Sequence, residues 1–520
     1  MSANNLSLLI NNILFTEKSI IFEDRPLDIV KVPIPDSISS PKFGILKLNA
    51  ITASLSKENI DIIFMVDRSG SMSDLCSDGR SKMQHICHTL NNMVLYFKDN
   101  AAIKAHITIH AFDNLIYNIV DRCKVNEENI NEILFKISHI TPKDSTDIEL
   151  ALKDISATAE KIRNENADSE IVSIFMTDGE VSAGKNETGF LCQLVDKSIC
   201  NYFIGFGVEH DAVLLNALGN SDKSSYHFID KLENSGYVYG EILHEIVYKL
   251  LFCVKVEITD GLIYDYKNNL WVNSLYVGNI VSEANKIYHI SCSSLKGCRI
   301  LLKAQQKVYD DKGSETIMSH EILIFDESSV EDLNKYVFRQ RTMQLLYAIN
   351  TYNNNNNRRR KIMGIFGRNR RSVSNDEDSP NLKDQLNVFL TEMKKYMTEN
   401  GLENDKLMKN LCDDIYISLR TFGTQFGAMY SSARQTSQGT QRCYTVSHTP
   451  EAQNDDFVSR LTLTRQTNKL YDNFEDLMLD HFANDISQHQ VSGLEDSPFL
   501  SPSAAQVMRN ISRKEEDKKE

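Results

Sequence analysis

The chain of 520 residues has no apolar run near the ~20 residues that a membrane-spanning helix needs. It has no CxxC pair among its ten cysteines, and such scattered thiols fit the reduced state expected in the cytosol or nucleus. It also lacks a basic excess, because 57 Lys and Arg are outnumbered by 71 Asp and Glu, for a net charge of −14. This balance argues against general affinity for nucleic acid or an anionic membrane.

The N-terminal stretch Leu6–Phe15 is apolar but short, lacks a basic leader and is interrupted by Asn11 and Asn12. We interpret it as a buried helix or strand and not as a signal peptide. We therefore expect a cytoplasmic protein with no membrane partner. The basic cluster at 358–371 is a candidate nuclear localisation signal or RNA-touching patch, and its alternative interpretation is a solvated linker balanced by the acidic residues that follow.

Apolar runs of strand length alternate with helical spacing from residue 58 to residue 252. Ile60–Val66 and Ile171–Met176 are almost wholly apolar, whereas Lys82–Phe97 and Ile148–Ile162 repeat their apolar residues with helical periodicity. Val238–Leu251 is predicted to be the last helix of this series. Such alternation indicates an α/β domain with a doubly wound, mostly parallel, Rossmann-like sheet covered on both faces.

Residues 253–328 contain strand-like runs separated by Asp-Gly, Asn-Asn and Lys-Gly turns, which predict an antiparallel, β-sandwich-like domain. The segment 1–57 carries proline and alternating apolar positions, as in Ile29–Ile34, and reads as extended chain. It is a candidate source of further strands for the β domain, because the two segments flank the same α/β insert.

The rest of the chain is predicted to be helical where it is ordered. We expect a helix at 329–352, a disordered basic and acidic linker at 353–380, a helical region at 381–445 and a largely disordered acidic tail at 446–520. The linker contains five consecutive asparagines and then the basic cluster, a composition that buries little apolar surface. Within the tail, Leu470–Phe482 has the spacing of a short amphipathic helix, and the chain after Ser501 is expected to be disordered.

A carboxylate and two hydroxyls follow the first apolar strand in the segment Asp67-Arg68-Ser69-Gly70-Ser71. Asp67 stands where the strand ends, and open α/β sheets bind ligands outside the carboxyl ends of their strands. Side chains spaced two apart on the following turn can converge as hard oxygen donors. Such donors suit Mg²⁺, with Mn²⁺ or Ca²⁺ as alternatives.

Two later segments end at the same edge. Thr146 lies just before the helical stretch at 148–162 and can add a hydroxyl, and Asp178 follows the strand at 171–176 and can add a second carboxylate through water. The sequence therefore predicts one metal site made by Asp67, Ser69, Ser71, Thr146 and Asp178.

Together these segments resemble the metal-ion-dependent adhesion site (MIDAS) of von Willebrand factor A (vWA) domains. The five positions and the strand and helix signals between them match in order over roughly residues 58–252. The resemblance implies that the last metal ligand is an Asp or Glu carboxylate of a protein partner. Because only two protein carboxylates face a divalent ion, the site keeps positive character and attracts an anion. A vWA fold whose site is intact but idle, or occupied only structurally, is the alternative.

Nothing near this segment resembles an activated nucleophile or a general base, so we expect no enzymatic activity. The expected function is that of an intracellular scaffold or adaptor that binds protein through Mg²⁺.

Residues 201–212 and 226–229 are similar to one branch of vWA proteins, which includes plant RING-type ubiquitin ligases and protist proteins that join vWA to a Hint domain. Segments 426–430 and 438–442 resemble the end of the helical region of that branch. A RING needs eight Cys or His ligands in close pairs, and this sequence has no such array. The resemblance therefore leaves an alternative function, that of a substrate receptor or accessory protein of a ubiquitin-ligase pathway without its own RING.

Two further sites are weaker alternatives. Cys443 stands where a Hint domain would place its nucleophile, but the residues after it are few and polar. His85 and His88 share a helix face near Cys76 and Cys87, a grouping that admits zinc. The competing interpretation of both groups is structural: a free thiol in a loop, and polar residues on a helix.

Overall fold

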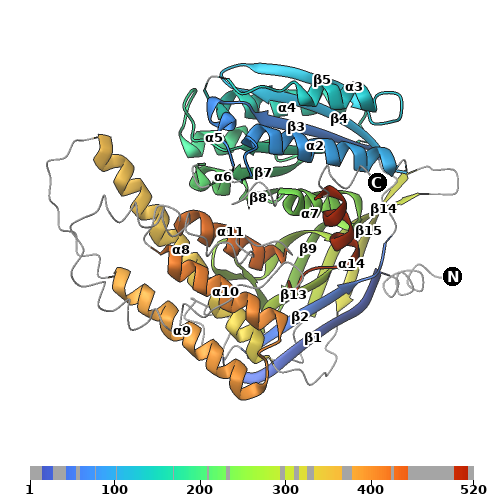
Figure 1. Cartoon of the computed structure of the whole chain (residues 1–520). Helices are drawn as coiled ribbons and strands as arrows, with labels where there is room; N and C mark the ends of the chain where they lie inside the picture. Colours follow the sequence, from blue (N-terminus) through green and yellow to red (C-terminus); the bar gives the residue numbers. More distant parts are fainter. Residues whose placement is uncertain are drawn as a thin grey trace, which may run out of the picture. The chain divides into compact units, whose positions relative to one another are not determined.

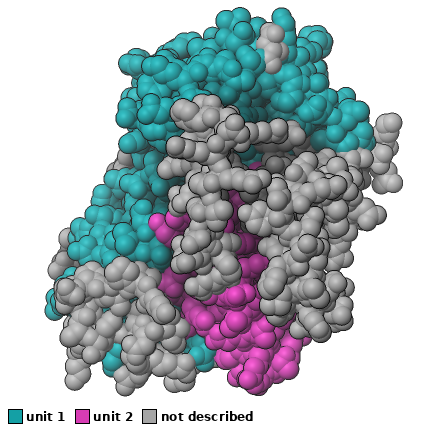
Figure 2. All heavy atoms as spheres, turned by 90° about the vertical axis from the view of Figure 1, so that its left-hand side faces the viewer, with its two compact units in different colours: residues 1–336, 439–442, 501–520 teal, residues 337–438, 443–500 magenta. Residues whose placement is uncertain are grey.

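The computed structural model describes residues 14–26, 42–53, 59–76, 78–100, 102–143, 145–167, 169–207, 210–229, 235–292, 299–309, 315–324, 333–365, 378–422, 427–442 and 497–512. The chain divides into two compact units (Figure 2): unit 1 comprises residues 1–336, 439–442 and 501–520, and unit 2 comprises residues 337–438 and 443–500. Cys443 and the predicted helix Leu470–Phe482 lie outside the described residues.

A six-stranded sheet forms the α/β domain of unit 1, with the strand order β5-β4-β3-β6-β7-β8 (Figure 1). The strands are β3 (Asn59–Asp67), β4 (Lys104–Phe112), β5 (Ile116–Lys124), β6 (Glu170–Thr177), β7 (Cys200–Phe206) and β8 (Ser224–Ile229). All neighbours are parallel except β4 and β5. Every residue of β3 after Asn59 is buried, as expected for a strand covered on both faces. The doubly wound α/β fold predicted from the sequence is confirmed.

Helices cover this sheet in two groups. The elements are η1 (Gly70–Ser73), α2 (Lys82–Asp99), α3 (Ile130–Ser138), α4 (Ile148–Glu165), α5 (Thr188–Leu194), α6 (Ala212–Leu218) and α7 (Ser235–Val247). Helix α2 contacts α3 and α7, whereas α5 contacts α4 and α6. Ser81 caps α2 in a capping box with Gln84, and the Asp147 side chain caps α4. These caps start both helices next to the loops that carry the predicted site.

Two antiparallel sheets form the β domain of unit 1. One sheet has the order β1-β2-β13-β10-β11 and the other β12-β9-β14-β15. Their strands are β1 (Phe15–Pro26), β2 (Lys42–Ala50), β9 (Lys249–Thr259), β10 (Gly261–Asp265), β11 (Leu270–Val272), β12 (Ser274–Val281), β13 (Asn285–Cys292), β14 (Arg299–Tyr309) and β15 (Glu315–Ile324). Strand β2 pairs with β13, so the N-terminal segment belongs to the same sheet as strands that lie more than 200 residues later in the chain.

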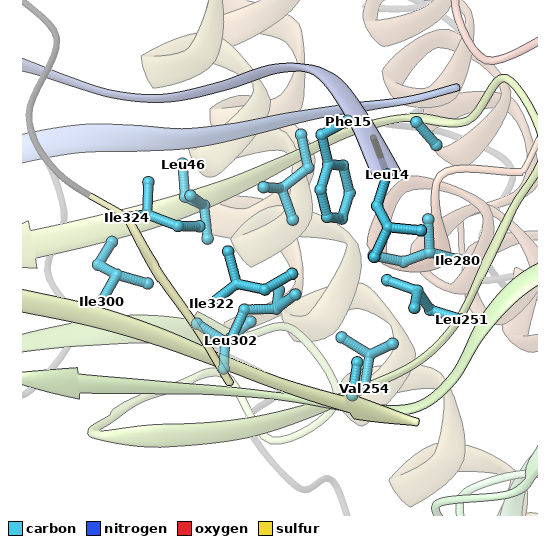
Figure 3. Close-up of a cluster of buried hydrophobic side chains, with 14 of the residues drawn as sticks. Leu14, Phe15, Leu46, Leu251, Val254, Ile280, Ile300, Leu302, Ile322 and Ile324 are labelled. Carbon is cyan, nitrogen blue, oxygen red and sulfur yellow. The ribbon is translucent and has the colours of Figure 1, made fainter. Parts of the chain in front are cut away.

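Side chains from both sheets share one apolar core (Figure 3). Leu46 of β2 and Ile322 of β15 are fully buried in it, as are Leu302 of β14 and Val254 of β9. The core therefore needs the N-terminal strands as well as those after the α/β domain.

The predicted helix Val238–Leu251 is too long, because α7 ends at Val247 and β9 begins at Lys249. The apolar run continues across this boundary, so composition gives no sign of the change. It is the pairing of Lys249 with Val281 of β12 that makes the second part a strand.

The described part of unit 2 is helical and contains four helices: α8 (Asn334–Ile365), α9 (Asp378–Asn400), α10 (Lys406–Thr421) and α11 (Gly427–Thr440). The first three residues of α8 and the last two of α11 belong to unit 1. Leu386 and Phe389 of α9 pack with Leu411 and Ile415 of α10 in the core of unit 2. Arg434 of α11 is fully buried and is neutralised by Asp414, with 2.5 Å between Nη1 and Oδ1.

The start of the predicted disordered linker 353–380 is helical, because α8 continues to Ile365. Asn353 is buried at 3% exposure, and its amide nitrogen lies 2.9 Å from the Cβ position of Gly427. Nearby, Asn350 exchanges hydrogen bonds with Gln435 and Ser432 of α11. Asn350 and Asn353 are therefore packed polar residues, which the sequence alone does not distinguish from low-complexity chain.

The prediction that the chain after Ser501 is disordered is wrong for residues 502–512, and residues 513–520 lie outside the described residues. Residues Pro502–Ile511 form α14, whose N-cap Ser501 accepts a hydrogen bond from the backbone N–H of Ala504. Its apolar face packs on α7 and α2 and consists of Ala504, Val507, Met508 and Ile511. That i, i+3, i+4, i+7 spacing after a Ser-Pro start was a readable helix signal. The acidic composition of the surrounding tail favoured the prediction of disorder despite this helix signal.

Candidate metal centre

The predicted ligands meet at the carboxyl edge of the parallel sheet. Asp67 is the last residue of β3, and Asp178 directly follows β6, the parallel neighbour of β3. Ser69 and Ser71 lie at the start of η1, and Thr146 lies in the loop before α4. Since Val66 pairs with Met176, the two carboxylates leave adjacent strands almost level with each other.

Hydrogen bonds join three of these side chains directly. The Ser71 hydroxyl donates to Oδ1 of Asp178 over 2.8 Å, and the hydroxyl oxygens of Ser69 and Ser71 are 3.1 Å apart. Oxygen donors from two loops that lie 107 residues apart in sequence are thus within one hydrogen-bonded cluster.

Thr146 belongs to the same cluster. A Cβ placed on Gly179 would lie 3.3 Å from the Thr146 hydroxyl and 4.0 Å from the Ser71 hydroxyl, so both oxygens face this glycine. The Thr146 backbone is held by Ser182, whose hydroxyl accepts from the Thr146 N–H over 2.8 Å. The Asp-Gly pair therefore leaves open the space into which these hydroxyls point.

Two hydrogen bonds orient the Asp67 carboxylate. The backbone N–H of Ser69 donates to Oδ1 over 2.7 Å, and the hydroxyl of Thr177 donates to Oδ2 over 2.5 Å. Thr177 is a site residue that sequence reasoning missed. Its signal was a hydroxyl at the end of a mostly apolar, buried strand, where a polar group needs a partner.

The cluster is buried and rich in negative charge. Asp67 is fully buried and Asp178 is 1% exposed, while Ser71 is half-buried. Burial raises the pKa of Asp67 to about 6, the hydrogen bonds from Thr177 and Ser69 oppose this rise, and the charge of Asp178 adds to it. A buried carboxylate whose ionised form is disfavoured gains from a nearby cation.

A second residue that sequence reasoning missed supplies such a cation. The ammonium of Lys82 lies 2.6 Å from Oδ2 of Asp178 and 3.4 Å from Oδ2 of Asp74. Burial lowers the pKa of this ammonium, but the hydrogen bond and charge of Asp178 outweigh burial, and the pKa is raised overall. Its sequence signal was a basic residue in the first turn of a helix, where the helix dipole disfavours it.

The donor set fits a hard divalent ion. Two carboxylates and three hydroxyls are oxygen donors of the kind that Mg²⁺ and Ca²⁺ take, and Gly179 leaves them room. No group of three or more His, Cys, Asp or Glu within the described ranges could hold a metal ion, so any ion held here depends on the hydroxyls.

The alternative zinc grouping on α2 is not assembled. The ring Nε2 of His85 lies 3.1 Å from Oδ1 of Asp78, while the thiol of Cys87 donates to the backbone carbonyl of Ile137 over 3.3 Å. On strand β4, His110 contacts Asp154, with 2.5 Å between Nδ1 and Oδ2. These residues have structural partners of their own.

Residues that carry the resemblance to one vWA branch have structural roles within unit 1. Tyr226 of β8 bonds the ring of His210, with 2.6 Å between its hydroxyl and Nε2. Arg442 contacts the ring of His227 and donates to the backbone carbonyl of Tyr226 over 3.1 Å. Two motifs far apart in sequence are therefore in contact within unit 1. His210 of the first motif also interacts electrostatically with Asp178 of the predicted metal site.

A mostly parallel α/β sheet with these loops at its carboxyl edge defines a vWA-type domain. Residues 62–180 match the family described as von Willebrand factor type A domain, so the chain contains a vWA domain. The matched span includes all five predicted ligands. vWA domains typically mediate protein–protein interactions and often bind a divalent metal at their MIDAS.

Among solved structures, the chain is similar to a von Willebrand factor type A protein from Catenulispora acidiphila, with 14% identity, a TM-score of 0.43, and coverage of 64% of this chain and 81% of that chain. The ArnB paralog VWA2 from Sulfolobus acidocaldarius is 12% identical with a TM-score of 0.43, over 81% of this chain and 96% of that one. Proximal thread matrix protein 1 from the mussel byssus, with a zinc-occupied MIDAS motif, is 18% identical with a TM-score of 0.28, over 35% and 46%. No curated protein matches the chain.

Proposed function

We propose that the vWA domain binds Mg²⁺ through Asp67, Ser69, Ser71, Thr146 and Asp178, and that the bound ion captures an Asp or Glu side chain of a protein partner. The chain would then act as a scaffold or adaptor.

The observation that carries this proposal is the convergence of oxygen donors from three loops at one sheet edge. Asp67 is oriented by Thr177 and by the backbone of Ser69, and the Ser71 hydroxyl links its own loop to Asp178. A bound divalent ion would supply positive charge with an open position for one more oxygen ligand. In this arrangement the contacts of the side chains hold oxygen atoms in place, which supports metal binding and not catalysis.

Charge at the site favours an anionic ligand. Two carboxylates balance a divalent ion, and the buried ammonium of Lys82 adds positive charge that the exposed carboxylate of Asp74, 3.4 Å away, offsets only in part. An acidic side chain is the protein group that complements this charge and the oxygen preference of the ion.

The surroundings of the site favour a protein as the source of that carboxylate. Leu75, beyond η1, is 73% exposed, and Leu115, in the loop after β4, is 57% exposed. Both loops contact the metal-site segment, because the backbone N–H of Asp74 donates to the Ser71 carbonyl and Asp113 pairs with Arg68 over 3.6 Å. Exposed apolar side chains next to a charged site are typical of an interaction surface.

We propose a cytoplasmic location on the evidence of the cysteines. Free thiols in the described ranges include those of Cys87, Cys200 and Cys412, as in a reducing compartment. No helix in this part of the chain is long and apolar enough to cross a bilayer.

A matched pair of serine variants tests the metal site. Ser71→Ala removes a hydroxyl of the cluster, whereas Ser73→Ala removes an exposed hydroxyl of the same turn that donates to the Gly70 carbonyl. In isothermal titration with MgCl₂, we expect Ser71→Ala to weaken binding by about tenfold or more, an effect like that of losing one supporting ligand. Equal affinity of the two variants would contradict the assignment.

Partner capture is tested by affinity purification of the full chain with Mg²⁺, with EDTA, and as Asp67→Ala. We expect specific partners only in the first sample. Recovery of the same partners in all three samples would refute metal-dependent binding.

A further inference from the structure

Lys82 is the first residue of α2, directly after the capping residue Ser81. Its side chain is only 15% exposed, and its ammonium lies 2.6 Å from the buried carboxylate of Asp178. Its other partner, Asp74, is 58% exposed and 3.4 Å away, so solvent screens that contact. The close, buried contact is therefore the one with Asp178.

This placement runs against local preference. A helix N-terminus carries partial positive charge and favours acidic residues, but the first turn of α2 contains no acidic residue and begins with a lysine. Burying a long flexible side chain also costs conformational entropy. A residue that violates the local preferences of its helix in this way is expected where its side chain has a role in a functional site.

Both carboxylate oxygens of Asp178 accept hydrogen bonds. Its Oδ1 accepts from the Ser71 hydroxyl and its Oδ2 from the Lys82 ammonium. Asp178 and Ser71 are thus held together by contacts that need no metal. A cation that neutralises Asp178 also lies close to any divalent ion held by the same cluster, and like charges repel strongly where water is excluded.

We propose that Lys82 is a built-in counter-cation of the metal site: it holds Asp178 in place when no ion is bound, and it lowers the affinity of the site for Mg²⁺. This inference rests on the proposed function and adds a residue that sets the metal affinity.

A consequence follows for the partner. Because Lys82 leaves the loaded site with excess positive charge, an incoming carboxylate stabilises the bound ion as well as itself. Metal and acidic ligand then bind cooperatively, and each raises the affinity for the other by the same factor.

The test is titration of the full chain with MgCl₂ at one fixed pH, comparing wild type with Lys82→Gln and Lys82→Arg. Glutamine keeps a hydrogen-bond donor for Asp178 without the charge, and arginine keeps the charge. We expect Lys82→Gln to bind Mg²⁺ about tenfold more tightly or better, and Lys82→Arg to remain near wild type.

Lys98→Gln is the matched control. Lys98 lies in the last turn of the same helix, about 24 Å along its axis, and pairs with Asp99 and Glu127. The Lys98→Gln substitution changes the net charge of the chain by the same amount as Lys82→Gln. Tightening in both variants to the same extent would show a general charge effect and overturn the inference.

Thermal melts supply a readout that does not depend on the titration. In EDTA, we expect Lys82→Gln to melt below wild type, because Asp178 has lost its cation. Saturating MgCl₂ should raise the melting temperature of Lys82→Gln more than that of wild type. Equal shifts would overturn the role of Lys82.

The outcomes separate the two proposals. If wild type and Lys82→Gln bind Mg²⁺ with equal affinity, the inference fails and the proposed function stands. If only Lys82→Gln binds, the inference stands and metal-dependent function of the natural chain fails. If neither binds, both fail.

Discussion

Gly240 lies in the middle of α7, beneath α14. A substitution at this residue tests the packing of α14 on α7 through the sign of the change in the free energy of unfolding. A Cβ on Gly240 would lie 2.5 Å from the Cα of Met508 in α14. The obstacle is backbone, so α14 must move to admit a methyl group. Gly240→Ala therefore has two effects of opposite sign on stability: it improves the helix propensity of α7, and it creates a clash with α14.

The magnitudes decide the sign. Replacing glycine by alanine inside a helix stabilises by about 0.5–1 kcal/mol. Overpacking a close contact costs about 1–3 kcal/mol. We expect a net loss of about 1–2 kcal/mol in the free energy of unfolding of unit 1.

Urea unfolding followed by tryptophan fluorescence measures this change. The chain has a single tryptophan, Trp271, which is buried in the β domain of unit 1. Gly189→Ala in α5 is the matched control, because nothing lies within 4 Å of its Cβ position. It should stabilise the protein by up to about 1 kcal/mol.

Opposite signs for the two glycine variants are the expected result. If Gly240→Ala stabilises the chain as Gly189→Ala does, α14 does not lie against α7 and the reasoning is refuted.

Three further outcomes follow from the contacts. Thr177→Val removes the hydroxyl that donates to Asp67, and titration should show Mg²⁺ affinity reduced by about tenfold; unchanged affinity would contradict its orienting role. Leu115→Ser should weaken partner recovery in affinity purification by severalfold, whereas Leu270→Ser, which is also exposed but lies in the β domain, should not. Burial lowers the pKa of His210 to about 4, so the unfolded chain takes up its proton first as pH falls below about 6.5. The free energy of unfolding should therefore drop by up to about 3 kcal/mol between pH 6.5 and pH 4, and His210→Gln should reduce that slope in urea titrations. A slope unchanged by the variant would show that His210 is not responsible.

Sequence pattern was sufficient for the α/β domain, because a parallel strand covered on both faces is a nearly continuous apolar run. Ile60–Val66 and Ile171–Met176 have this character, and both lie within central strands. Asp67 and Asp178 could be placed at one edge for the same reason, since parallel strands end on the same side of their sheet.

Only the tertiary structure brought Lys82 and Thr177 to the site. The Lys82 ammonium meets Asp178, which lies 96 residues away in sequence, and the Thr177 hydroxyl meets Asp67, 110 residues away. No local periodicity records such pairs, because they depend on how helix α2 and strand β6 pack beside β3.

The sequence by itself determined the alternation of strands and helices and the order of the predicted ligands, since both are written in local spacing. The tertiary structure decided what completes each layer. Strand β2 pairs with β13, and α14 lies on α7 where Gly236 and Gly240 admit its backbone. These choices depend on burying the remaining apolar faces of elements hundreds of residues apart, and such long-range packing is not encoded in any single stretch of chain.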